Sequence, residues 1–204
     1  MALLVPVLVA AVGCETGPGR EMEDSAQRAY RGIVIDPPAT RPDIVMADVR
    51  GTDFDLEKET EGRLLFLFIG YTNCPDVCPV HMANLASVLG QRSEWDARTT
   101  VVFVTADPER DTPERMREWL GAFSSKFVGL RGSREEVNAL EDALKLPRSI
   151  LPEARDTFYT VGHAAHVVAF SPDGRQLLYP FGTRQEDFAH DIPRLLAEVD
   201  RGAE

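Results

Sequence analysis

Two cysteines four positions apart have the clearest chemical potential in this sequence. Cys74 and Cys78 lie in the run GYTNCPDVCP (residues 70–79), directly after a continuous apolar stretch. A buried strand that ends where a helix begins places both sulfurs at the sheet edge where α/β proteins form their sites. The positive end of the helix dipole lowers thiol pKa values, so both sulfurs can be thiolates near neutral pH.

The spacing of the pair predicts metal binding. Three residues separate the cysteines, whereas redox oxidoreductases have two. The longer loop lets the sulfurs spread around an ion and still permits a disulfide between Cys74 and Cys78, either redox-active or purely structural. Two thiolates joined by one imidazole are soft ligands of low coordination number, which favour Cu(I), while zinc normally takes a fourth ligand. Copper is therefore the predicted metal, as Cu(I) and also as Cu(II).

Alternating strands and helices are expected to position the cysteines. Apolar runs predict strands over 64–71, 100–106 and 127–130, a hairpin over 167–179, and a small hairpin of 44–46 with 53–56. Helical spacing and caps predict helices from about Cys78 onward and over 114–123, 135–144 and 185–199, the last kinked or restarted at Pro193. This order predicts an α/β, thioredoxin-like fold with a central mixed β-sheet flanked by helices.

The N-terminal part of the chain predicts export and lipid anchoring. Residues 1–14 (MALLVPVLVAAVGC) form an apolar run too short to span a bilayer, as in a signal peptide, and they end like a bacterial lipobox with Cys14 as the lipidated residue. Residues 15–40 are polar and proline-containing, which predicts a flexible linker. Residues 41–204 are the predicted domain. We therefore expect an extracytoplasmic protein on the periplasmic side, held at the membrane by a lipid anchor.

Composition limits the range of partners. The 204 residues are 44% hydrophobic, enough for the core of one ordinary domain. The 33 acidic and 22 basic residues give a formal net charge of -11. This acidic balance argues against nucleic acid as a partner.

Two long motifs carry a resemblance to a known family. The runs GYTNCPDVCP (residues 70–79) and DPERDTP (residues 107–113) closely resemble the Sco/SenC family of copper-binding proteins, and the likeness extends from about residue 41 to residue 199. The resemblance implies a thioredoxin fold with the two cysteines as metal ligands. It also implies a third ligand, His163, in the stretch YTVGHAA (residues 159–165). Gly162 and Ala164 replace the Asp and Ser that usually flank this histidine, so a hydrogen bond that orients the imidazole is expected to be missing.

The same resemblance implies a function and its partners. Family members assist assembly of the dinuclear copper (CuA) centre of cytochrome c oxidase, by delivering copper or by keeping the target cysteines reduced. The implied role is a copper metallochaperone and not an enzyme. The implied partners are cytochrome c oxidase subunit II or another copper acceptor, together with an upstream copper donor or thiol reductant.

Other residues receive plainer interpretations. We expect His81 to be exposed in the first turn of its helix, His166 to be structural or exposed, and His190 to be solvated. Arg110 is available for a salt bridge that fixes the loops beside the site. The alternative function is a thiol-disulfide oxidoreductase or a peroxide-reducing enzyme on the same fold. A copper-dependent sensor is a third possibility.

Overall fold

Strand β4 (Leu64–Gly70) lies at the centre of the molecule, and every one of its residues is buried. Its sequence LLFLFIG has no polar side chain, as expected for a strand that is covered on both faces. β4 pairs in parallel with β5 (Thr99–Thr105) and antiparallel with β7 (His166–Phe170). The parallel pairing brings the C-terminal ends of β4 and β5 to the same edge of the sheet, where the cysteine motif begins.

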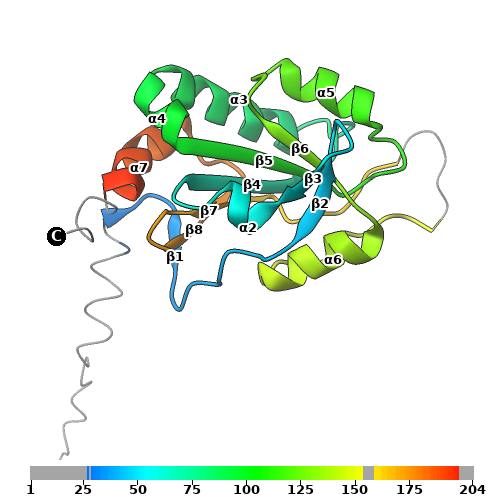
Figure 1. Cartoon of the computed structure of the whole chain (residues 1–204), viewed down its shortest axis with the longest axis horizontal. Helices are drawn as coiled ribbons and strands as arrows, with labels where there is room; N and C mark the ends of the chain where they lie inside the picture. The colour runs from blue at the N-terminus through cyan, green and yellow to red at the C-terminus, as the bar shows by residue number, and fades with distance from the viewer. Residues whose placement is uncertain (1–26, 28, 154–158, 198–204) are drawn as a thin grey trace, which may run out of the picture.

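The computed structural model describes residue 27 and residues 29–153 and 159–197, which form a mixed sheet with helices on both sides (Figure 1). The strand order is β1-β8-β7-β4-β5-β6-β2-β3, and the β4–β5 and β5–β6 pairs are parallel. The remaining strands are β1 (Ile33–Ile35), β2 (Val45–Asp48), β3 (Asp53–Asp55), β6 (Val128–Arg131) and β8 (Gln176–Pro180). The helices are α2 (Leu56–Glu59), α3 (Val77–Gly90), α4 (Ser93–Arg98), α5 (Pro113–Gly121), α6 (Arg134–Ala143) and α7 (Gln185–Ala197). The predicted α/β fold with a central mixed sheet is confirmed.

Aromatic side chains attach three helices to one face of the sheet. The ring pairs are Phe68 with His81 of α3, Phe103 with Trp119 of α5, and Phe66 with Phe188 of α7. Helix α6 covers the opposite side (Figure 1). No helix among the described residues is long and apolar enough to cross a bilayer.

Two helices begin with the caps that the sequence predicts, and the cysteine loop begins α3 in another way. Thr112 caps α5, and Ser133 with Glu136 forms a complete capping box on α6. At the start of α3, the Asp76 side chain makes no capping hydrogen bond. The Cys74 sulfur instead accepts a hydrogen bond from the Cys78 amide, with 3.4 Å between sulfur and nitrogen. The cysteine loop thus supplies its own helix cap.

The linker prediction for residues 15–40 is wrong for its last part. Within it, β1 pairs antiparallel with β8. The buried carboxylate of Asp191 accepts hydrogen bonds from the amides of Arg31 and Gly32 and from the Tyr179 hydroxyl. A partner that is distant in the sequence therefore orders a segment whose local composition favours disorder. Residues 1–14 lie outside the described residues.

The C-terminal helix continues through its proline and does not restart there. α7 runs without interruption from Gln185 to Ala197, although Pro193 lies inside it. Its buried residues include Phe188 and Leu195, on either side of the proline. Packing of this apolar face on the sheet keeps the helix in one piece despite the hydrogen bond that proline cannot donate.

Candidate metal centre

The cysteine loop joins the centre of the sheet to helix α3. After β4, the Cys74 amide donates a hydrogen bond to the Tyr71 carbonyl at 3.2 Å, which closes a turn. Cys74 is half-buried and Cys78 is fully buried, and both are free thiols in this structure. Cys74 is therefore the more exposed of the two cysteines.

His163 lies against this loop, although it is 85 residues after Cys78 in the sequence. The Cys78 sulfur and the His163 Nε2 atom are 3.6 Å apart. One ligand atom from each of Cys74, Cys78 and His163 lies within 4.8 Å of the others. These distances are short enough for one ion to contact all three atoms after small side-chain adjustments.

The expected loss of a hydrogen bond that orients His163 is wrong. Nδ1 of the imidazole is 3.1 Å from the carbonyl oxygen of Ala164, which can only accept, so Nδ1 carries the proton and donates it. Nε2, the other ring nitrogen, faces the Cys78 sulfur at 3.6 Å. The ring also meets Phe68 and Tyr71 edge to face, each with ring centroids 5.7 Å apart. A backbone carbonyl and two aromatic rings orient the histidine.

The two thiols differ strongly in acidity. The pKa of Cys74 is lowered to about 3, chiefly because the Cys78 thiol donates a hydrogen bond to it, and the Asp76 and Cys78 backbone amides and His163 add to the effect. Burial raises the pKa of Cys78 well above its ordinary value, and the neighbouring Cys74 thiolate adds to that shift. The metal-free site therefore holds a thiolate on Cys74 and a proton on Cys78.

The other histidines lie outside this group of ligand atoms. The prediction that His81 is exposed is wrong, because only 1% of its surface is accessible and its ring packs between Phe68 and Phe181. Burial lowers the pKa of His81 to about 4. His166 begins β7 and is partly buried. His190 is also partly buried, with its Nδ1 atom 2.7 Å from Asp191.

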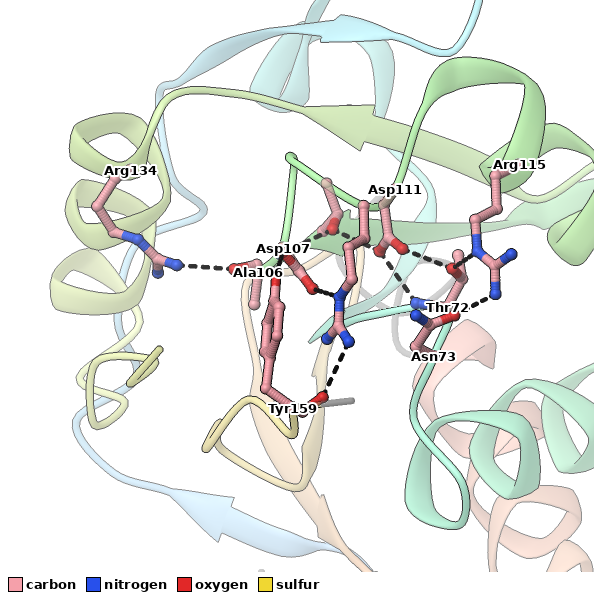
Figure 2. Close-up of polar contacts among 10 residues, drawn as sticks. Thr72, Asn73, Ala106, Asp107, Asp111, Arg115, Arg134 and Tyr159 are labelled. Carbon is pink, nitrogen blue, oxygen red and sulfur yellow. Dashed lines mark hydrogen bonds and ion pairs between the residues drawn. The ribbon is translucent and has the colours of Figure 1, made fainter. Parts of the chain in front are cut away.

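A loop after β5 contacts both parts of the site (Figure 2). Arg110 forms the predicted salt bridge, with Asp107, at 2.5 Å. Arg110 also donates to the Tyr159 carbonyl at 2.9 Å, and so reaches the segment that leads to His163. The prediction that Arg110 fixes the loops beside the site is confirmed.

Sequence reasoning missed the neighbouring Asp111. Its carboxylate is fully buried and accepts hydrogen bonds from the Thr72 amide and the Thr72 and Thr105 hydroxyls. Burial raises the pKa of this carboxyl, and the hydrogen bonds oppose the shift. One signal could have revealed the contact, since Thr72 and Asp111 both follow the C-terminal ends of adjacent parallel strands.

Fold and site together define a class of protein. A mixed sheet of thioredoxin type carries two cysteines at a strand-to-helix junction, and a histidine from a distant segment joins them. The ligand atoms are soft and few, which suits a transition metal ion with sulfur preference. This is the class of thioredoxin-like metal-binding proteins.

The chain belongs to the SCO1/SenC family, whose sequence pattern matches residues 36–197. A Stutzerimonas stutzeri protein whose name refers to copper binding is 31% identical over 170 residues, 82% of each chain. The human mitochondrial SCO1 homolog is 37% identical over 128 residues, which are 60% of this chain and 42% of the human protein. The chain thus matches less than half of the human protein's length.

Solved structures agree with this assignment. The copper-bound ScoI of Bradyrhizobium japonicum matches with a TM-score of 0.68 at 28% identity, over 78% of this chain and all 100% of that one. The copper-bound ScoI of Arabidopsis thaliana matches with a TM-score of 0.69 at 25% identity, over 78% and 99% of the two chains. The fold resembles these two proteins along nearly their whole length.

Proposed function

We propose that this protein is a copper metallochaperone that assists assembly of the dinuclear copper (CuA) centre of cytochrome c oxidase. The observation that carries the proposal is the convergence of Cys74, Cys78 and His163 on one point. Two sulfurs and one imidazole nitrogen are soft ligands that favour Cu(I) over hard ions such as Mg²⁺ and Ca²⁺, which prefer oxygen ligands. Family membership and the copper-bound ScoI structures support copper as the cargo.

The acid-base state of the cysteines fits capture and release of an ion. Cys74 is already a thiolate, so copper binding displaces one proton, from Cys78. Nδ1 of His163 faces the Ala164 carbonyl, and Nε2 is the ring nitrogen that faces the sulfurs. Cys74 and His163 are partly buried while Cys78 is fully buried, so an acceptor thiolate would approach copper from the side of Cys74 and His163.

Partners and location follow from the same proposal. The acceptor is cytochrome c oxidase subunit II or another copper-binding protein, and an upstream copper donor or thiol reductant supplies the site. The protein acts outside the cytoplasm, on the periplasmic side, with Cys14 as the lipid-bearing residue of a membrane anchor. Mass analysis of the protein from its native membrane tests the anchor, because lipidation at Cys14 predicts a mature chain that starts there.

A copper titration tests the ligand set. The reduced protein should bind one copper ion, and Cys74→Ser, Cys78→Ser and His163→Ala should each weaken binding. Binding should release one proton per ion from the wild-type protein near neutral pH. Unchanged copper affinity in all three variants would end the proposal.

One observation favours a second candidate, a thiol-disulfide oxidoreductase or peroxide-reducing enzyme. An exposed thiolate on Cys74 beside a buried thiol on Cys78 is the arrangement of an attacking and a resolving cysteine. Against it, residues 161–167 contain no proline, whereas ordinary thioredoxins carry a cis-proline before the strand beside the site. Reduction of insulin disulfides or of peroxide by metal-free protein, unaffected by His163→Ala, would favour the enzyme.

A further inference from the structure

The loop of residues 107–111, between β5 and α5, is hydrogen-bonded to both halves of the candidate metal centre (Figure 2). The half that holds the cysteines follows β4. The half that holds His163 precedes β7, and it has no regular structure of its own between Tyr159 and the isolated bridge at Gly162. Because the 107–111 loop is bonded to both segments, its contacts help to set the distance between the two sulfurs and the imidazole.

Asp111 holds the cysteine half. The Thr72 amide donates to one carboxylate oxygen at 2.9 Å, and the Thr72 hydroxyl donates to the other at 2.5 Å. Arg115 donates to the Thr72 hydroxyl oxygen at 2.6 Å and also to the side chain of Asn73. Thr72 is two residues before Cys74. These bonds fix the backbone where the cysteine loop leaves β4.

Arg110 and Asp107 hold the histidine half. The Arg110 guanidinium lies 3.4 Å from the centroid of the Tyr159 ring, and Nη1 donates to the Tyr159 carbonyl at 2.9 Å. The Tyr159 hydroxyl donates to Asp107 at 2.8 Å, and Asp107 accepts from Arg110 Nε at 2.5 Å. Tyr159 is thus held at its carbonyl, its ring face and its hydroxyl. It stands four residues before His163.

Arg110 also approaches the ring that packs on the histidine. Its guanidinium carbon is 5.7 Å from the centroid of the Tyr71 ring, and Tyr71 meets His163 edge to face. Arg110 therefore contacts Tyr159 in the histidine half and the Tyr71 ring in the segment that leads to the cysteines. A lysine could not reproduce these contacts, because they use a planar fork and a flat stacking face.

We propose that Arg110, oriented by Asp107, is a positioning residue that sets His163 against the two cysteines. This inference rests on the proposed copper site and deepens it. The contacts of Arg110 are with Asp107, Tyr159 and Tyr71, so it acts on the ligands through the two tyrosines. Its loss should release the imidazole while the cysteine loop stays in place on Asp111. Two thiolates can still hold Cu(I), whereas Cu(II) depends on the nitrogen ligand, so the deficit should be larger for Cu(II).

The main test replaces the ion pair with a neutral pair, Asp107→Asn with Arg110→Gln, so that neither buried charge is left without a partner. We expect Cu(II) affinity to fall by about 10–100-fold, the usual effect of losing a group that orients a metal ligand. The thiolate-to-Cu(II) charge-transfer band should move to the position seen in His163→Ala. Cu(I) affinity, measured by chelator competition, should fall much less. An unchanged band and unchanged Cu(II) affinity would overturn the inference.

A double-mutant cycle separates positioning from general destabilisation. In a His163→Ala background, the neutral pair should cause no further loss of Cu(II) affinity, because the ligand that it positions is already gone. Fully additive losses would contradict the inference. Arg110→Lys should not restore the wild-type spectrum, and full restoration by lysine would also count against it.

Two further variants complete the design. Arg117→Gln removes an exposed arginine that donates to the Val49 carbonyl away from the site, and its copper spectrum should match that of the wild type. Should the neutral pair fail to fold, Tyr159→Leu removes the stacking face and the hydroxyl, and it should shift the same band. If Cys74→Ser, Cys78→Ser and His163→Ala all leave copper affinity unchanged, the proposed function fails. If His163→Ala weakens binding while the neutral pair and Tyr159→Leu do not, only the inference about Arg110 fails.

Discussion

The cysteine loop and the histidine segment meet at one site but are built differently. Cys74 and Cys78 lie between a fully buried strand and a helix, and their geometry follows from those two elements. His163 lies in a segment without regular structure, and side chains from other parts of the fold hold it there. The cysteine half is therefore fixed by a strand and a helix, with the hydrogen bonds to Asp111 added, whereas the histidine half has no regular element of its own and depends on side chains from other segments.

The largest expected difference between the halves concerns thiol reactivity. With a pKa of about 3, Cys74 should react with iodoacetamide at pH 5, while buried Cys78 remains unmodified in the folded protein. The Cys74 rate should vary little between pH 5 and pH 8, whereas an ordinary thiol would slow by about 10³-fold over that range. Mass spectrometry of timed samples gives both rates. A tenfold fall per pH unit at Cys74 would show that the thiolate is not stabilised.

Removing one ligand from each half is expected to have unequal effects. Cys78→Ser should lower Cu(I) affinity by about 100-fold or more, given metal-binding free energies of about 10–16 kcal/mol shared among three or four ligands. His163→Ala should lower Cu(I) affinity less, because the soft sulfurs remain, and should lower Cu(II) affinity more, because Cu(II) depends on the nitrogen ligand. Chelator competition for each oxidation state measures the difference. Equal losses for both variants and both ions would remove the distinction between the halves.

A steric change at the end of β4 tests how rigid the cysteine half is. A Cβ atom at Gly70 would lie 2.8 Å from the Cys78 sulfur and 2.8 Å from the Phe68 ring. Gly70→Ala should therefore lower the free energy of unfolding by about 1–3 kcal/mol and displace the buried sulfur.

Urea denaturation and copper titration of Gly70→Ala would measure both effects. Gly90→Ala is the matched control at the end of α3, where an added Cβ meets no atom within 4 Å. The control should be neutral or raise stability by about 0.5–1 kcal/mol. Wild-type stability in Gly70→Ala would show that the junction adjusts freely.

The smallest expected effect concerns His81, whose neighbour Phe68 also touches His163. Its folded pKa of about 4 lies below the unfolded value of 6.5, so the unfolded state binds the extra proton first as the pH falls. Stability should drop by about 1 kcal/mol between pH 7 and pH 5.5 for this reason. His81→Phe should lack that part of the pH dependence and bind copper normally. Identical pH profiles for the two proteins would contradict the assignment.

Local patterns in the sequence predicted the elements around the cysteines well. The apolar run of β4, the proline and helical spacing of α3, and the caps of α5 and α6 lie within a few residues of the features they determine. Patterns of this kind require no knowledge of the rest of the fold. The cysteine half of the site was therefore accessible from composition and spacing.

Features that depend on distant partners were missed or misjudged. The linker prediction fails at β1 because that strand pairs with β8, and Asp191, about 160 residues away, holds the residues before it. The prediction of an exposed His81 fails because Phe181, which helps to cover it, follows β8. His163 was identified only through the family resemblance, since a lone histidine carries no local signal. Its hydrogen bond to a backbone carbonyl cannot be seen in residue identities at all.

The sulfur that caps α3 links the chemistry of the site to the end of a helix. The Cys78 amide points at Cys74, and Asp76 offers no substitute acceptor. An ion or a disulfide that draws charge from Cys74 weakens that acceptor, so the first turn of α3 loosens when the sulfur is engaged and tightens when it is free. Amide hydrogen exchange at Cys78 would then report whether the Cys74 sulfur is free or bound, because that sulfur accepts the hydrogen bond of the Cys78 amide.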